Sequence, residues 1–359
     1  MIFLNTYFID MKSTSYQLYR RLLREILWVN FSKSQLSIQI HCNIPHLEGK
    51  TVNLRLVFLI ILQVFLLQKA VGSPMPQKVV YGDDDRENIE DVTDSTILLQ
   101  SKAIAIKVPA RKLINKNQGQ YKFRFHSLGV AMNLCPGEKN YDEPFLGSCS
   151  GFLVNPTTLV TAAHCVTDLT DCHTNRWVFN FTTDETTIFK SSVYECKNII
   201  LRKEQIDQNN HIDYAIIELD RPVKNVQPLP TRPHGKIKRG QKLYVIGHPS
   251  GTKMKYAANA KVKPFTKLNF QFPFKIERNE YYPKRKDIFL GNLDTFSGNS
   301  GSPVFNSNTG LVEGILIEGE DDFVFDSDLG CMKINQLKNK AFGVGERIQR
   351  ILRLPLKKP

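Results

Sequence analysis

The chain has seven cysteines but no two of them form a CxxC pair. Structural zinc sites are usually built from such pairs, so this absence argues against a zinc centre. We expect no metal and no cofactor. Internal repeats and low-complexity tracts are also missing. A hydrophobic fraction of 42% and a charged fraction of 23% are those of an ordinary folded protein, which excludes wholesale disorder.

The six cysteines after residue 72 are an even number and are scattered among strand-like segments. This pattern favours disulfide bonds, which require an oxidising compartment. Cys149 and Cys165 bracket a hairpin, and we expect them to pair. The other four allow three pairings. Cys172 with Cys196 is favoured, because both flank the same predicted strand pair, and this leaves Cys135 with Cys331.

Helical periodicity is absent from residue 98 until the end of the chain. Short β-type runs separated by turn residues predict an all-β protein, an antiparallel sandwich or barrel. The proline-rich stretch 221–236 predicts a connection between two β domains of comparable size, 79–220 and 237–359. Residues 346–354 (ERIQRILRL) are apolar at helical spacing and predict a closing C-terminal helix.

The longest apolar run, residues 56–67, is too short to span a bilayer comfortably. With Arg55 before it and Ala70-Val71-Gly72 after it, the run is typical of a secretory signal over residues 51–72. Residues 1–50 are then an extension from a start assigned too far upstream. The alternative is a real extension with the run as a signal anchor. We expect a secreted or periplasmic monomer without stable membrane association after signal cleavage.

Residues 292–306 read NLDTFSGNSGSPVFN and predict a reactive serine. The glycines around Ser300 allow a tight turn in which the amides of Gly298 and Ser300 point to one spot, as an oxyanion hole requires. A serine also needs a base to take its proton. The alternative is an ordinary surface turn.

The base is predicted at His164, which ends an apolar strand beside Cys165 in the sequence TAAHC. A lone histidine on an apolar strand is more often a core residue, but the expected disulfide to Cys149 would pin this loop. Such a closure contributes about 3 kcal/mol in the chain-entropy model. His248 is the one rival that we consider.

Asp213, in HIDYAIIEL, enters a nearly continuous apolar strand, where an unpaired carboxylate would be costly. We therefore expect it to orient the imidazole. The resulting order of His164, Asp213 and Ser300 differs from that of α/β-hydrolases, and their GxSxG motif fails at Ser302.

The blocks TAAHC, DYAIIEL and SGNSGSPVFN resemble the three catalytic blocks of chymotrypsin-fold serine peptidases, in particular the bacterial glutamyl-endopeptidase-like branch. The resemblance spans about residues 79–350. It implies two six-stranded antiparallel β-barrels with the site between them, and protein or peptide substrates. It also implies that His164 is the general base, Asp213 its orienter and Ser300 the nucleophile, with the oxyanion hole at Gly298 and Ser300.

The same resemblance gives expectations for specificity. Thr295 matches the carboxylate-binding threonine of glutamyl endopeptidases, but Leu316 stands where they carry a pocket histidine. Asp294 occupies the position where trypsin-like relatives keep the aspartate that binds Lys and Arg, and Glu318 opens an acidic rim over residues 318–322. We expect cleavage after Arg or Lys. The alternative is Glu or an apolar residue at P1, if loop lengths turn Asp294 away from the pocket.

The segment VVYGDDDRENIEDVTD, which begins at Val79, resembles the mature amino terminus of this branch. Residues 73–78 would then be a short propeptide. Animal relatives carry an aspartate before the nucleophile, where it receives the new amino terminus. Asn299 stands there in this chain, so that ion pair cannot form.

Two other classes of function are alternatives. A catalytically inactive relative that serves as a binding module would lack a triad residue, and none is missing. A nucleic-acid binder would rest on residues 261–286, where basic and aromatic residues interleave. A basic, aromatic β-hairpin explains those residues equally, and the net charge of +13 does not single out nucleic acid. We expect no nucleic-acid partner.

Overall fold

The structure is a computed structural model that describes residues 80–116, 118–207, 210–264, 286–319, 321–337 and 345–356. All of them belong to one compact unit. The expected extension, signal and propeptide (1–50, 51–72 and 73–78) lie outside the described residues, as does most of the predicted basic hairpin. No helix in the described ranges is long and apolar enough to cross a membrane.

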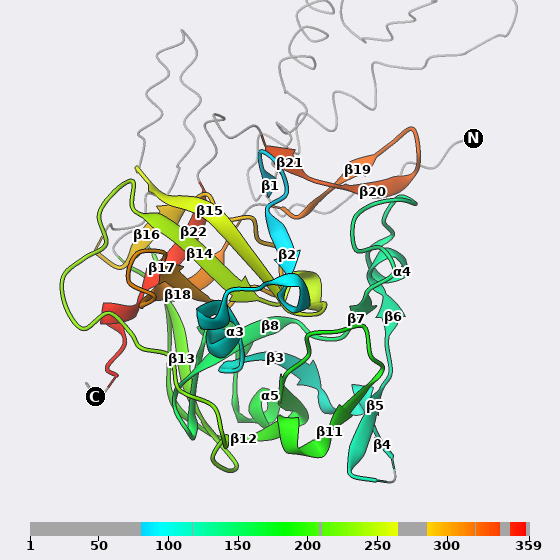
Figure 1. Cartoon of the computed structure of the whole chain (residues 1–359), viewed down its shortest axis with the longest axis horizontal. Coiled ribbons are helices and arrows are strands. Elements are labelled where there is room, and N and C mark those ends of the chain that lie inside the picture. Colours follow the sequence, from blue (N-terminus) through cyan, green and yellow to red (C-terminus); the bar gives the residue numbers. More distant parts are fainter. Residues whose placement is uncertain are drawn as a thin grey trace, which may run out of the picture. The chain divides into compact units, whose positions relative to one another are not determined.

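Six antiparallel strands close into a first barrel (Figure 1). Its strands are rich in β-branched and aromatic residues, which suit a pleated surface packed on one side. Phe152, Leu159, Trp177 and Phe179 fill the interior and are at most 1% exposed. In order round the barrel the strands are β10 (Asn175–Phe179), β12 (Val193–Ile206), β13 (His211–Leu219), β9 (Thr158–Thr161), β8 (Cys149–Asn155) and β3 (Ile104–Pro109).

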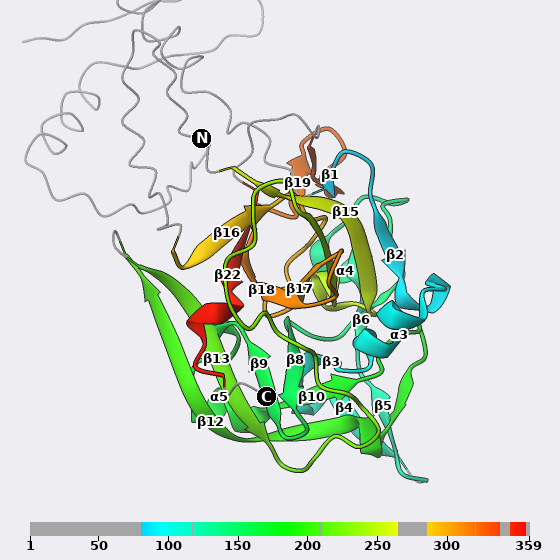
Figure 2. The same cartoon turned by 60° about the vertical axis from the view of Figure 1, so that its left-hand side comes forward.

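A second ring of six antiparallel strands is seen in Figure 2, around the fully buried Leu243, Leu293, Val304 and Ile348. Its order is β14 (Lys242–Gly247), β17 (Pro303–Asn306), β18 (Val312–Glu318), β22 (Glu346–Arg350), β16 (Ile288–Gly291) and β15 (Lys255–Lys263), and β15 pairs with β14 to close it. The predicted fold class of two six-stranded barrels is confirmed. The stretch 221–236 runs between them; Leu229 N donates to Leu153 O in the first barrel, and Thr231 pairs with Val312 in the second.

The C-terminal helix predicted over residues 346–354 does not form. The segment is strand β22 followed by a single 3-10 turn, η6 (Ile351–Arg353). Pairing with β18 and β16 closes the second barrel, and this gain overrides the apolar spacing that suggested a helix.

The described chain begins on the second barrel, although residues 79–220 were assigned to the first. Strand β2 (Arg86–Asn88) pairs with β15, and β1 (Val80–Tyr81) pairs in parallel with β21 (Gln336–Leu337). We call residues 80–88 the amino-terminal strap. The chain then reaches the first barrel through η1 (Ile89–Asp91) and α3 (Ser95–Ser101), whose first turn is capped by the Asp94 side chain.

Smaller elements surround the barrels. Around the first are η2 (Ala110–Lys112), the sheet of β4 (Leu113–Lys116), β5 (Gln120–Phe123) and β11 (Thr187–Phe189), the pair β6 (His126–Ser127) and β7 (Pro144–Phe145), α4 (Leu128–Met132), η3 (Ala163–Cys165), α5 (Leu169–Thr174) and η4 (Lys190–Ser192). Around the second are η5 (Pro249–Gly251) and the hairpin of β19 (Phe323–Asp326) and β20 (Cys331–Ile334).

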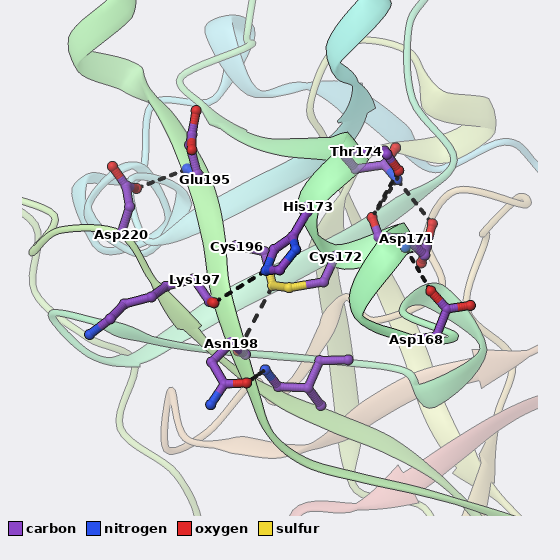
Figure 3. The surroundings of a disulfide bond; sticks show 12 residues. Asp168, Asp171, Cys172, His173, Thr174, Glu195, Cys196, Lys197, Asn198 and Asp220 are labelled. Carbon is purple, nitrogen blue, oxygen red and sulfur yellow. Dashed lines mark hydrogen bonds between the residues drawn. A yellow bond between two sulfur atoms is a disulfide. The ribbon is translucent and has the colours of Figure 1, made fainter.

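All three expected disulfides are present. Cys149–Cys165 joins β8 to η3, and Cys135–Cys331 joins the loop after α4 to β20. Figure 3 shows the third, Cys172–Cys196, which ties α5 to β12, with Asp168 capping the helix through the amide of Asp171.

Candidate active site

Asp213 lies near the start of β13 and is 3% exposed. One carboxylate oxygen, Oδ1, accepts hydrogen bonds from the amides of Ala163 (2.6 Å) and His164 (3.1 Å). The other, Oδ2, lies 2.6 Å from His164 Nδ1. Three donors thus compensate for the burial of the carboxylate. Because Oδ2 can only accept from the ring, Nδ1 carries the proton and Nε2 of the neutral imidazole is left as the acceptor.

Charge around His164 favours its protonated form. Burial alone would lower the pKa of the ring, but the hydrogen bond and charge of Asp213, together with the charges of Glu204 and Glu318, outweigh burial. The pKa of His164 is therefore raised above its ordinary value, although the ring remains 37% exposed at the surface. An imidazole with this setting can take up a proton from a neighbouring hydroxyl.

Ser300 is held next to the histidine loop through its backbone. Its carbonyl accepts from the amide of Ser150 at 2.8 Å and lies 3.6 Å from Cys165 Sγ. The sulfurs of Cys149 and Cys165 and a ring nitrogen of His164 all lie within 4.8 Å of one another. Both sulfurs are in a disulfide bond, so this cluster offers no thiolate to a metal. The backbone of Ser300 and the ring of His164 thus share Cys165 as a neighbour.

The turn before Ser300 requires a glycine at position 298. Gly298 has a φ of +94°, and a Cβ there would lie 2.5 Å from Gly251 N and His248 O, so only glycine fits. Among the described residues, no protein acceptor receives a hydrogen bond from the amides of Gly298 or Ser300. An oxyanion hole needs two N–H donors, and within the described part of the chain these two amides have no protein acceptor.

Asn299 closes the turn locally. Its carbonyl accepts from Ser302 N at 2.8 Å, and its side-chain Oδ1 accepts from Ser302 Oγ at 3.3 Å. Its amide donates to Phe296 O at 2.9 Å. These bonds hold the turn without the amine–carboxylate pair of the animal relatives.

A cavity of about 790 Å³ adjoins Ser300. Thr295, Leu316 and Glu318 line it, as was expected of the substrate pocket. Four acidic residues line it, Glu318, Asp321, Asp322 and Glu346, and no lysine, arginine or histidine is among the described residues that line it. Glu318 forms an ion pair with Arg347, which lies outside the lining. The described lining of the cavity therefore carries more acidic than basic side chains.

Asp294 does not line this cavity, which differs from the expectation that it forms the base of the pocket. It is 3% exposed, and its oxygens accept from the strap amides of Tyr81 (2.7 Å) and Asp85 (2.9 Å). Burial, with the charges of Asp84 and Asp85, outweighs these two bonds and raises the pKa of Asp294 to about 6. Asp294 therefore holds the amino-terminal strap in place.

Sequence reasoning missed Glu346, which supplies a carboxylate to the cavity from β22. It is 1% exposed and accepts from Thr295 Oγ1 (2.8 Å) and Tyr81 Oη (3.3 Å). Glu346 was missed because residues 346–354 were predicted to be a helix. Reading the same residues as a strand would have placed Glu346 on the inward face with Ile348.

His248, the rival base, is a core residue. It is fully buried, which lowers the pKa of its ring to about 4. The ring stacks on Phe181 at a centroid distance of 6.0 Å, and Nδ1 lies 3.0 Å from the carbonyl of Thr252. The backbone of His248 does lie beside the residues that hold Ser300, because its amide donates to Ser150 Oγ at 3.0 Å. Its ring, however, contacts Phe181 and Thr252 and is kept neutral, so we assign it a structural role.

Residues 149–315 match the family model of the trypsin-like peptidase domain. The chain carries a trypsin-like peptidase domain. The match confirms the expected trypsin-like peptidase domain, and the matched residues include all three predicted triad members. The match supports the expectation of a serine endopeptidase.

The serine protease FAM111A of Mus musculus is 30% identical to this chain over 126 residues, which cover 29% of the chain and 20% of that relative. The match thus spans a fifth of the relative's length. Among solved structures, the active form of the Rv3671c protease from M. tuberculosis has 14% identity and a TM-score of 0.38 and covers 80% of this chain and 94% of its own. A Glu endopeptidase has 17% identity and a TM-score of 0.39, with coverages of 72% and 94%.

The first prediction concerns the titration of His164. We expect an NMR titration to give a pKa above 6.5 for this ring. Glu204→Gln should lower that pKa, because it removes one of the negative charges that favour the imidazolium. Glu195 pairs with Arg176 and is the control. Glu195→Gln should leave the pKa of His164 unchanged. An equal shift in both variants would contradict the assigned cause.

The second prediction concerns stability and Asp294. Its folded-state pKa is raised from 3.8 to about 6, so its stabilising contribution is fully present below about pH 4 and is lost as the pH rises to about 6. In Asp294→Asn, the free energy of unfolding from urea titrations should therefore fall less steeply over this window. Some pH dependence of the unfolding free energy should remain in this variant, because the pKa of Asp322 is also raised to about 6. The exposed Asp142→Asn serves as control, and a slope unchanged in Asp294→Asn would refute the assignment.

Proposed function

We propose that this chain is a serine endopeptidase that hydrolyses peptide bonds through an acyl-enzyme on Ser300. The observation that carries the proposal is the bonding of Asp213, which fixes the His164 ring at 2.6 Å in the loop that adjoins Ser300. The family match supports it.

In this mechanism the Ser300 Oγ attacks the substrate carbonyl carbon while His164 Nε2 takes the hydroxyl proton. The carbonyl oxygen becomes an oxyanion and receives hydrogen bonds from the amides of Gly298 and Ser300. The C–N bond then breaks, and the imidazolium gives its proton to the leaving amine. Water, deprotonated by His164, releases the acyl group and restores the Ser300 hydroxyl. Asp213 stays ionised and stabilises the imidazolium at each stage.

The cavity favours a basic residue at P1. Four acidic residues and no basic one are among its described lining residues, and Glu318 among them pairs with Arg347. This excess of acidic side chains favours Lys or Arg over Glu, which argues against the glutamyl alternative. We propose Glu346 as the group that binds the cationic tip, in place of Asp294. Its two hydroxyl donors, Thr295 and Tyr81, orient a carboxylate that has up to four acceptor sites.

The three disulfides fit an oxidising compartment. We propose that the domain is secreted or periplasmic and acts as a monomer on proteins or peptides. The expected signal and propeptide would be removed before it acts.

The third prediction tests the reaction itself. Ser300→Ala and His164→Ala should each lower kcat/KM on peptide substrates by about 10⁵- to 10⁶-fold, as in other triads. Exposed Ser307→Ala should have no effect. A phosphonylating serine reagent should label the wild-type protein at Ser300 and should not label Ser300→Ala. Labelling at another serine, or hydrolysis retained by Ser300→Ala, would overturn the proposal.

The fourth prediction separates Glu346 from Asp294. Glu346→Gln should lower kcat/KM on Arg and Lys substrates by about 10- to 100-fold, since a hydrogen bond to a charged group contributes roughly 1.5–3 kcal/mol. Asp294→Asn should keep the ratio of basic to other P1 residues, whatever it does to stability. A peptide-library digest measures both. If Asp294→Asn lowers the preference for Arg and Lys and Glu346→Gln does not, Asp294 is the residue that binds the basic side chain. Cleavage by the wild-type protein mainly after Glu would refute the basic preference.

A further inference from the structure

The cavity beside Ser300 is too large for one side chain. Its volume of about 790 Å³ is of the size that holds a whole small-molecule ligand, roughly 300–1,000 Å³. Its lining is also of two kinds. The carboxylates come from residues 318–322 and β22, whereas Met132, Phe145, Phe323 and Met332 supply apolar surface. We call these four residues the apolar wall. All four are half-buried.

The apolar wall is assembled from both barrels. Met132 ends α4 and Phe145 lies in β7, in the long connection between β5 and β8 of the first barrel. Phe323 and Met332 belong to the β19–β20 hairpin, an excursion of the second barrel. Figure 1 shows this hairpin next to α4. No single loop could form this surface.

Covalent and backbone bonds hold the two halves together. Cys135–Cys331 joins them, Cys135 N donates to Met332 O at 2.9 Å, and Met332 N donates to Asn133 O at 2.8 Å. Farther along, Ile334 N donates to the Glu138 carboxylate at 3.1 Å. The apolar wall is therefore preformed, and a preformed site loses less conformational entropy on binding.

Its side chains suit a large and variable apolar group. Methionine is unbranched and adapts to the shape of what it packs against. Phe323 is fixed by edge-on packing against Phe296 at a centroid distance of 5.3 Å. The wall thus combines a rigid aromatic with two adaptable thioethers.

We propose that the apolar wall is a second subsite, which binds a large apolar side chain of the same peptide whose basic side chain enters the acidic part of the cavity. The occupant is a substrate side chain because the wall is continuous with the cavity that Ser300 lines. This inference rests on the proposed peptidase function. The enzyme would then recognise two side chains at once, one basic and one apolar.

The test is a peptide library with Arg fixed at P1 and the positions on either side varied. We expect one further position to favour Leu, Met or Phe over Ser by about tenfold or more in kcat/KM. In Met132→Gln/Met332→Gln, a double variant of similar side-chain volume, that preference should fall to about twofold or less. Met132→Leu/Met332→Leu should retain it. A single-residue arginine anilide, which does not reach the wall, should be cleaved alike by all three proteins.

A matched pair of disulfide variants checks how the wall is held. Cys135→Ser/Cys331→Ser should lose the apolar preference but keep cleavage of the arginine anilide. Cys172→Ser/Cys196→Ser should keep both, because neither α5 nor β12 contributes a residue to the cavity lining. Thermal melts confirm that each variant is folded. Where the glutamine pair does not fold, Met332→Gln alone gives the same comparison.

The outcomes separate the two proposals. If the wild-type protein cleaves neither peptides nor the anilide and Ser300 is not labelled, the peptidase function fails. If it cleaves both but no second position favours apolar residues, or the preference survives in the glutamine variants, the second subsite is refuted. Apolar residues preferred at P1 itself would make the whole cavity a single pocket and would equally overturn it.

Discussion

The hydrogen bonding of Asp213 is the interaction on which the site depends. A buried carboxylate is costly without donors, and this one obtains them from the loop that carries the imidazole, which draws that loop onto β13. The amide of the same residue donates to Gln349 Oε1 at 3.0 Å, and Gln349, in β22 of the second barrel, donates in turn to Asp287 O at 2.9 Å. Gln349 is fully buried, so the bond between the barrels is shielded from water. One aspartate thus links the base, its own barrel and the neighbouring one.

Much of this arrangement could be predicted, because its signals are local. His164 and Asp213 stand at the ends of apolar strands, and Ser300 stands in a glycine-rich turn, so each carries its own pattern of neighbours. The three disulfides followed from an even count of cysteines and from which strands they flank. The strands themselves were recognisable because short apolar runs separated by turn residues leave few alternatives.

The parts that could not be predicted depend on partners remote in sequence. The position of Asp294 before the serine says where its backbone lies, but its carboxylate is directed by amides more than 200 residues away, at Tyr81 and Asp85. The spacing of Ile348, Ile351 and Leu354 fits a helix as well as a strand; barrel closure decides between them. Glu346 was missed with the strand that carries it. The apolar wall joins residues near 132 to residues near 332, and no local pattern signals such a meeting.

Tyr81 contacts two acidic residues that lie more than 200 positions away in the sequence. Its amide donates to Asp294, which holds the strap, and its hydroxyl donates to Glu346, which lines the cavity. Removal of the chain through Tyr81 would leave the three proposed triad residues in place but would take away a hydrogen-bond donor from Glu346, the residue proposed to bind the substrate side chain. On the proposed mechanism, chains that begin on either side of this tyrosine would share one reaction and differ in the side chains that they select.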